Sequence, residues 1–299
     1  MIQSMRNQRE NCLICGNSNI EKLSPMFSRY QIKWVMHVGI CPQCGHVQLS
    51  PLPTPEEVEF FNNAFLGAKY SPGKAESKDN ELKLKRLQEK IGTLIQPGMK
   101  VLDIGAGEGW AMAYFQAQQC EYFGIEAIDE LRLSLKERGA TVISSSIYDD
   151  ISQYRGAFDI IVFRHILEHL IEPRKALKQV ENLLSVDGRL YLALPNAEDP
   201  DTSKGLLTSY FRPVHVSYFC PENVKRLGDE VGLKTYSIEA GREIAAIMGK
   251  NCDRGTERRL SNYYIKMKGV VKHARGKAIS TDLKNLLKIV IHRLFLARR

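Results

Sequence analysis

The stretch Val101-Leu102-Asp103-Ile104-Gly105-Ala106-Gly107-Glu108-Gly109-Trp110 decides the fold of this chain. Its first half is apolar, which is typical of a strand buried on both faces. Three glycines within five residues follow, and they permit positive φ angles and let a ligand approach where a Cβ would block it. Residues 111–119 then suit a helix. The pattern predicts a strand, a ligand-binding glycine turn and a helix.

The surrounding residues argue against a nicotinamide-dinucleotide site. Such a site needs the spacing Gly-x-Gly-x-x-Gly, but Trp110 stands where the third glycine would be. Asp103 also places negative charge where a pyrophosphate would bind. A second short strand is expected over 122–125 and ends in Glu126, whose carboxylate can accept hydrogen bonds from both hydroxyls of a ribose.

The motif resembles the cofactor loop of class I S-adenosylmethionine-dependent methyltransferases. The resemblance implies an α/β fold with a doubly wound, Rossmann-like methyltransferase sheet, in which Asp103 faces the cationic end of the cofactor and Glu126 binds its ribose. Further strands are expected over 140–144, 158–163, 189–194 and 233–239, and a seventh over 244–248. The other cofactor-binding residues that the resemblance implies are Gly105, Ala106, Gly107, Ser146, Phe163 and Arg164.

Two Cys-x-x-Cys-Gly pairs lie near the N-terminus, separated by twenty-five residues, and their cysteines are Cys12, Cys15, Cys41 and Cys44. Each pair makes a tight loop that points two thiolates inward. Four thiolates saturate a tetrahedral Zn²⁺ ion and leave no open position, so the predicted site is structural, and the metal would supply folding energy to a short segment. Redox dithiols are the alternative interpretation.

A helix start follows the second cysteine pair. Thr54 as N-cap, Pro55 at the first helical position and Glu57 three residues after the cap predict a helix over 55–61. A zinc ribbon, this helix and a methyltransferase loop, in that order, resemble the zinc-ribbon methyltransferases of bacterial cell-surface glycan and deoxysugar biosynthesis. The resemblance implies a small-molecule or lipid-linked sugar as acceptor. The Tyr-x-Glu-His element of the sugar C-methyltransferases of this group is absent from the sequence, which favours oxygen as the methylated atom.

Residues 164–169, Arg-His-Ile-Leu-Glu-His, follow the fourth predicted strand at its carboxyl end, where ligands bind in open α/β sheets. Imidazole and carboxylate groups at this spacing share one face of a helical turn. They could act as a general base, fix the strand end, or bind a divalent metal with a later histidine, an arrangement that resembles that of small-RNA terminal methyltransferases. That histidine lies in an aromatic insertion over 210–219, which resembles the family's substrate loop. The candidate catalytic residues are His165, Glu168, His169 and His215.

The net charge of +8 is uneven, because residues 250–299 hold fourteen Lys and Arg against three Asp and Glu. Apolar residues at 283, 286, 287, 290 and 294 predict an amphipathic helix. This helix could lie on an anionic membrane surface or pack on the body or on a second subunit. RNA methylation or RNA binding through the ribbon and the tail is the alternative function.

The expected organisation is a zinc ribbon over 1–50, a linker with helices over 51–96, a Rossmann-like domain over 97–249 and a basic helical tail over 250–299. The sequence shows no leader pattern and no apolar stretch of about 18 residues. The expected location is therefore the cytoplasm, with possible attachment to the inner face of the membrane. The sequence leaves the oligomeric state open.

Overall fold

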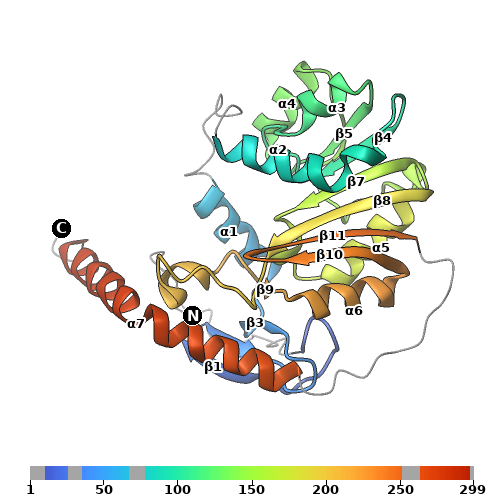
Figure 1. Ribbon diagram of the computed structural model, residues 1–299. Helices are drawn as coiled ribbons and strands as arrows, with labels where there is room; N and C mark the ends of the chain where they lie inside the picture. The colour runs from blue at the N-terminus through green and yellow to red at the C-terminus, as the bar shows by residue number, and fades with distance from the viewer. Residues whose placement is uncertain (1–10, 26–35, 67–77, 251–262, 297–299) are drawn as a thin grey trace.

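The computed structural model describes residues 11–25, 36–66, 78–250 and 263–296 (Figure 1). A seven-stranded sheet with the order β10-β11-β8-β7-β4-β5-β6 forms its centre. The five strands from β8 to β6 pair in parallel, and β11 and β10 are added in antiparallel fashion. The strands are β4 (Lys100–Ile104), β5 (Glu121–Ile125), β6 (Thr141–Ser144), β7 (Phe158–Arg164), β8 (Leu184–Pro195), β10 (Leu233–Ala240) and β11 (Glu243–Lys250). The predicted α/β sheet, including its seventh strand, is confirmed.

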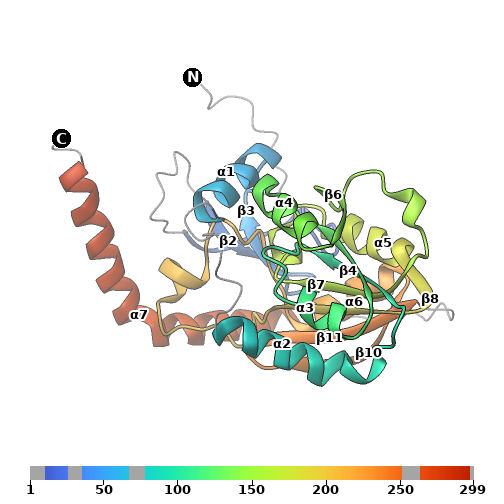
Figure 2. The ribbon, with the colours of Figure 1, turned by 90° about the horizontal axis from the view of Figure 1, so that it is seen from above.

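Helices cover both faces of this sheet (Figures 1 and 2). Alternate residues of the central strands point to opposite faces: Val101 and Val162 pack with helix residues such as Phe115, whereas Leu102 and Phe163 belong to the core on the other face. The helices on the first face are α2 (Lys78–Ile91), α3 (Met112–Ala117) and α4 (Asp129–Glu137), and those on the second face are α5 (Pro173–Leu183) and α6 (Pro221–Val231). Because β4 pairs in parallel with both β5 and β7, the carboxyl ends of these three strands meet at one edge of the sheet.

Helix α1 (Pro55–Leu66) begins where the capping box predicted. The backbone N–H of Thr54 donates to Oε2 of Glu57 at 3.0 Å, and the N–H of Glu57 donates to Oγ1 of Thr54 at 3.3 Å. The helix ends at Leu66 rather than near residue 61, because the apolar pattern continues beyond Phe61.

A second, four-stranded sheet contains a strand that the sequence analysis did not anticipate. Its order is β1 (Glu21–Pro25), β2 (His37–Ile40), β3 (Val47–Ser50) and β9 (Ser217–Tyr218). The strand β9 comes from the predicted substrate loop and pairs with β3. This sheet, the loop and the C-terminal helix share one apolar core. The cysteine-bearing segment is thus joined to the loop that carries His215.

Helix α7 (Tyr263–Leu296) packs on the body through small and apolar residues and one carboxylate, namely Met267, Ala274, Ala278 and Asp282. Asp282 is 4% exposed and accepts hydrogen bonds from consecutive backbone N–H groups of the short helix η4 (Leu206–Tyr210), at 3.1–3.2 Å. Helix α7 therefore packs against the body, but through residues other than the leucine face for which the sequence analysis offered this alternative.

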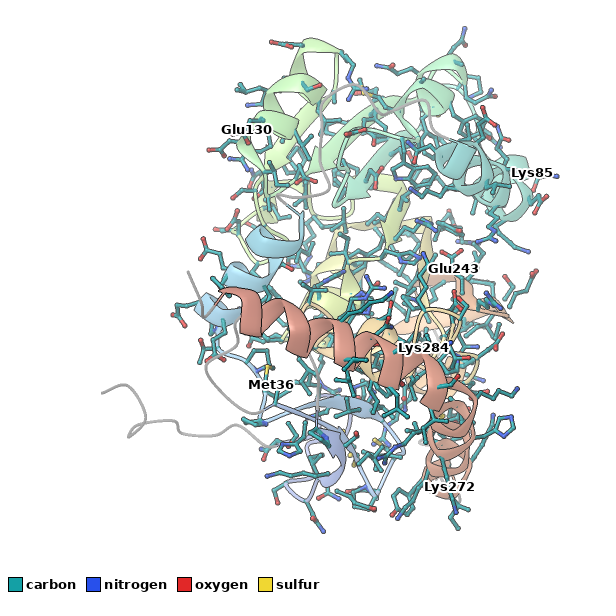
Figure 3. The ribbon with its side chains drawn as sticks, turned by 90° about the vertical axis from the view of Figure 1, so that its left-hand side faces the viewer. Met36, Lys85, Glu130, Glu243, Lys272 and Lys284 are labelled. Carbon is teal, nitrogen blue, oxygen red and sulfur yellow. The ribbon has the colours of Figure 1, made fainter. Side chains whose placement is uncertain are left out.

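The leucine face of α7 is not the face that packs. Leu283 and Leu287 are 61% and 62% exposed, Ile279 is 59% exposed, and Leu286 is half-buried. Basic residues, including Lys272 and Lys284, stand along the same helix (Figure 3). The side chains at 290 and 294 lie outside the described part of the structure. Among the described helices, none is both long and apolar enough to cross a membrane.

Candidate active site

The glycine turn follows β4 directly and has the predicted conformation. Gly105, Gly107 and Gly109 have φ angles of 73°, 56° and 70°, which residues with a Cβ rarely adopt. A Cβ on Gly105 would lie 2.2 Å from Cδ1 of Ile166. Because Ile166 belongs to the histidine-bearing segment after β7, the glycine turn and that segment are in direct contact. The two parts of the predicted site are therefore adjacent.

Asp103 lies at the end of β4 and is 1% exposed. The hydroxyl of Tyr122 donates to its Oδ2 at 2.7 Å. Burial raises the pKa of the Asp103 carboxyl to about 7, although the hydrogen bond from Tyr122 opposes that shift. The carboxyl is therefore half-ionised near neutral pH, and a cation bound beside it would favour the ionised form.

The affinity for S-adenosylmethionine, the cofactor that the resemblance of the glycine motif implies, is accordingly expected to rise with pH. Below about pH 7 Asp103 is protonated, so binding of the sulfonium cofactor must first release that proton. Each unit below the pKa then weakens binding by up to about tenfold. Calorimetry between about pH 5.5 and pH 8 measures this dependence. Asp103→Asn, which cannot ionise, should bind weakly with a flat profile; an unchanged pH slope in this variant would contradict the assignment.

Glu126 follows β5 and faces the glycine turn. Its Oε2 accepts the N–H of Gly107 at 2.8 Å, and its Oε1 accepts the N–H of Ile128 at 2.9 Å. The side chain is 7% exposed. Each carboxylate oxygen has a second lone pair, so both can still accept from the vicinal hydroxyls of a ribose.

The loop after β6 is organised by a carboxylate that the sequence analysis did not assign. Oδ2 of Asp149 accepts the N–H of Ser146 at 3.1 Å and the hydroxyl of Ser145 at 3.3 Å, and it also accepts the hydroxyl of Ser144. Ser146 therefore takes part through its main chain. The run of three serines ahead of Asp149 was the available signal, since serine hydroxyls and amides commonly bond to a carboxylate a few residues away.

The side chains of two predicted cofactor contacts at the end of β7 are engaged with other residues of the protein. Phe163 is fully buried in the apolar core, so any contact with the cofactor would come from its main chain. Arg164 donates to Oε1 of Glu243 at 2.6 Å, and its guanidinium lies 5.9 Å from the centre of the Trp110 ring. The side chain of Arg164 thus spans the space between the glycine turn and β11.

Glu243, the first residue of β11, joins this edge of the sheet. Oε1 of its carboxylate lies 2.7 Å from Nε2 of His165, and Oε2 accepts a hydrogen bond from Nη1 of Arg86 at 2.9 Å. Although burial opposes ionisation, the hydrogen bond from His165 and the charge of Arg164 hold the pKa of Glu243 at about 2. Sequence reasoning missed Glu243, because only the antiparallel placement of β11 beside β8 brings it here.

The four candidate catalytic residues come together, from two segments of the chain. His165 has a φ of 54°, and the next residues form the short 3₁₀ helix η3 (Leu167–His169). Oε1 of Glu168 lies 3.5 Å from Nδ1 of His165 and 4.0 Å from Nε2 of His169. The rings of His169 and His215 stand perpendicular to each other with 4.9 Å between their centres.

The substrate loop is docked onto this cluster by main-chain contacts. Nδ1 of His169 lies 2.7 Å from the carbonyl oxygen of Val214, and the N–H of Val216 donates to the carbonyl oxygen of Glu168 at 2.8 Å. Burial lowers the pKa of His169, so its imidazole is neutral at physiological pH. A neutral imidazole beside a carboxylate can accept a proton or bind a cation.

A profile of the methyltransferase domain family matches residues 77–238, more than half of the chain. The chain belongs to this family. The family match, the glycine turn and the strand order together identify the chain as a class I S-adenosylmethionine-dependent methyltransferase with the Rossmann-like fold.

Individual relatives are distant from this methyltransferase. Ubiquinone biosynthesis O-methyltransferase from Cronobacter sakazakii is 26% identical over 123 residues, which cover 39% of this chain and 50% of that protein. Uncharacterized methyltransferase YcgJ from Bacillus subtilis is 32% identical over 108 residues, covering 34% of this chain and 43% of that protein. The chain spans about half the length of the curated relatives it matches.

A solved structure shows the same fold. It is a crystal structure of Burkholderia thailandensis 1,6-didemethyltoxoflavin-N1-methyltransferase with bound 1,6-didemethyltoxoflavin and S-adenosylhomocysteine. It superposes with a TM-score of 0.53 at 16% identity and covers 77% of this chain and 100% of its own.

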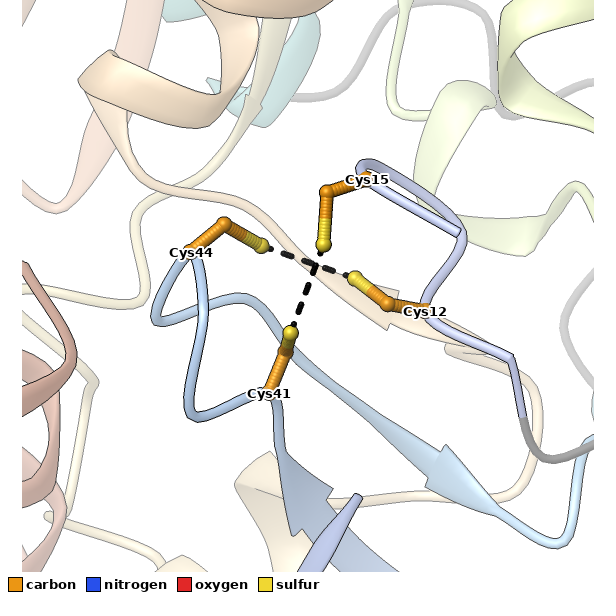
Figure 4. A group of neighbouring side chains, drawn as sticks. All are labelled: Cys12, Cys15, Cys41 and Cys44. Carbon is orange, nitrogen blue, oxygen red and sulfur yellow. Dashed lines mark hydrogen bonds between the residues drawn. The ribbon is translucent and has the colours of Figure 1, made fainter. Parts of the chain in front are cut away.

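The four cysteines of the methyltransferase's N-terminal segment converge as the spacing predicted (Figure 4). Sγ of Cys12 lies 3.5 Å from Sγ of Cys44, and Sγ of Cys15 lies 3.5 Å from Sγ of Cys41. All four sulfur atoms lie within 4.8 Å of one another. A tetrahedral Zn²⁺ with Zn–S bonds of about 2.3 Å needs sulfurs about 3.8 Å apart, so these residues fit that ion.

The second cysteine turn is tied to the methyltransferase's substrate loop by His46. This histidine is completely buried, with Nε2 at 3.2 Å from Oγ of Ser217 and Nδ1 at 3.3 Å from Oδ1 of Asn223 in α6. Both ring nitrogens are therefore used in hydrogen bonds. His46 is therefore a structural core residue rather than a metal ligand.

Proposed function

We propose that this methyltransferase transfers a methyl group from S-adenosylmethionine to a hydroxyl oxygen of a sugar or another intermediate of cell-surface glycan assembly. The observation that carries the proposal is the cluster of Glu168, His169 and His215 beside the glycine turn. An alcohol is a poor nucleophile until its proton leaves, and this cluster can take up that proton. The names of the O-methyltransferase relatives agree with oxygen as acceptor.

In the proposed reaction, Asp103 and Glu126 hold the cofactor, with the sulfonium near the first and the ribose on the second. The acceptor oxygen attacks the methyl carbon in line with the C–S bond. As the O–C bond forms, the C–S bond breaks, its electrons go to sulfur, and the hydroxyl proton passes to the cluster. Correct placement of the two reactants supplies most of the rate enhancement.

We also propose that the four cysteines hold a structural Zn²⁺ ion. The distances between the four sulfur atoms, which match those around a tetrahedral Zn²⁺, support this proposal. A saturated Cys₄ site has no place for a substrate, and its role is to fold the segment on which β9 and the substrate loop rest.

The exposed stripe of α7, formed by Ile279, Leu283 and Leu287, supports contact with an anionic membrane surface and hence a lipid-linked acceptor. RNA binding by the same tail has less support, because Tyr264 and Lys268 are already engaged with Glu21 of β1.

The proposal is tested with full-length protein and labelled S-adenosylmethionine. Label is expected to appear on hydroxyl groups of sugar acceptors and not on RNA, and anionic vesicles should raise the turnover of a lipid-linked acceptor but not of a soluble nucleotide sugar. If the protein binds the cofactor and labels RNA but no sugar, the proposal that the acceptor is a sugar or glycan intermediate is refuted. If calorimetry detects no binding of S-adenosylmethionine, the proposed methyl-transfer activity is refuted.

A further inference from the structure

Glu168 is a buried carboxylate without a hydrogen-bond donor. The residue is 1% exposed, and neither Oε1 nor Oε2 has a hydrogen-bond partner within the described ranges. Burying an ionised carboxylate without donors costs several kcal/mol. A native core seldom leaves such a group uncompensated. The nearest imidazole nitrogen, Nδ1 of His165, lies 3.5 Å away, beyond a good hydrogen bond. The position therefore favours the binding of a further positive charge beside Glu168.

His169 is held with a ring nitrogen turned toward this carboxylate. A carbonyl oxygen can only accept, so the 2.7 Å contact with Val214 places the proton on Nδ1 of His169. In the neutral ring the lone pair is then on Nε2, the atom that lies 4.0 Å from Oε1 of Glu168. An Nδ1–H bound to a backbone carbonyl, with Nε2 presented inward, is the usual orientation of a metal-binding histidine.

His215 completes a set of three donors. One nitrogen of His215, one of His169 and a carboxylate oxygen of Glu168 all lie within 4.8 Å of one another. The main-chain bond from Val216 to Glu168 holds the loop in this position. Metal–ligand bonds of about 2.1 Å would draw the three atoms closer together, which modest side-chain rotations can achieve.

We propose that Glu168, His169 and His215 form a binding site for a divalent first-row transition-metal ion, distinct from the cysteine site. Two imidazoles and one carboxylate suit such ions and leave coordination positions open. This inference rests on the proposed function, because the open position would receive the acceptor's hydroxyl oxygen. A hydroxyl bound to the metal has a lower pKa and loses its proton more readily. With the metal bound, that proton would pass to solvent, because the ion then occupies the lone pairs with which the cluster would otherwise accept it.

The test uses Mn²⁺ as the probe, since thiolates prefer softer ions and Mn²⁺ prefers nitrogen and oxygen donors. Full-length zinc-loaded protein, saturated with S-adenosylmethionine, is titrated with Mn²⁺, and the electron paramagnetic resonance signal of free Mn²⁺ is followed. Close to one equivalent is expected to bind. Glu168→Gln and His215→Gln should each weaken binding at least about tenfold, as expected for the loss of one ligand. Glu172→Gln, an exposed carboxylate nearby, is the matched control and should bind normally.

Three results would overturn the metal site: no Mn²⁺ binding by folded wild-type protein, unchanged binding in both ligand variants, or equal loss in the control. Thermal unfolding and zinc content establish that each variant is folded. Calorimetry with S-adenosylmethionine on the same samples separates the two proposals. Cofactor binding without Mn²⁺ binding would refute the metal site alone, whereas the absence of cofactor binding would refute the proposed function.

Discussion

Glu126→Ala is expected to weaken S-adenosylmethionine binding about 100-fold. The carboxylate of Glu126 lies between the amides of Gly107 and Ile128, in position to accept both ribose hydroxyls. Two hydrogen bonds to a charged group contribute about 1.5 kcal/mol each, and about 3 kcal/mol corresponds to roughly two orders of magnitude in the dissociation constant. Isothermal titration calorimetry with the full-length protein measures the change.

Two variants show whether the effect comes from the ribose contact. Glu126→Gln keeps the side-chain size and one acceptor oxygen, so we expect a smaller loss, of about tenfold. Glu130→Ala removes an exposed carboxylate of α4 and should bind the cofactor as the wild type does. If Glu126→Ala binds within about threefold of the wild type while remaining folded, Glu126 is not the ribose ligand.

Cys44→Ser is expected to remove zinc and to destabilise the N-terminal sheet by about 4 kcal/mol, within the range seen when a protein loses a metal site. The damage should spread to the substrate loop. The carbonyl oxygen of Cys44 accepts from Asn223, and β3 pairs with β9 immediately after His215. Metal analysis and the rate of tryptic cleavage, mapped to the region around β9, measure the two consequences.

The matched control for this change is Cys120→Ser. Cys120 is also buried, at 8% exposure, but it lies in the core beneath α3 rather than in the cysteine cluster. It should retain its zinc and its resistance to trypsin. Full zinc content in Cys44→Ser would show that the four thiols are not the ligands. Normal protease resistance around β9 would show that the cysteine-bearing segment does not support the substrate loop.

Much of the fold was predictable because its signals are local. A buried parallel strand followed by a glycine turn is written in adjacent residues, as are the capping box at Thr54 and the paired cysteine turns. The seventh strand was also expected over 244–248. Each of these depends on the backbone preferences of a few neighbouring residues, so no knowledge of distant contacts was required.

The candidate site was predictable only in part. The carboxyl end of β7 presents His165, Glu168 and His169 together, which the sequence analysis expected. Glu243 lies 78 residues from His165 in the chain, and its placement depends on the order of strands in the sheet. No local pattern carries that information.

The sequence by itself indicated the methyl donor and the fold class, because the glycine turn is contiguous and the two carboxylates predicted to bind the cofactor lie at the ends of successive strands. Only the tertiary structure decided how the acceptor side is built. There β9 joins the cysteine-bearing sheet to the substrate loop, and that loop brings His215 to the carboxylate of Glu168, which has no hydrogen-bond partner among the described residues. The physical reason is that a pairing between β3 and β9, about 170 residues apart, is stabilised by shared core packing and hydrogen bonds that no short stretch of sequence reveals.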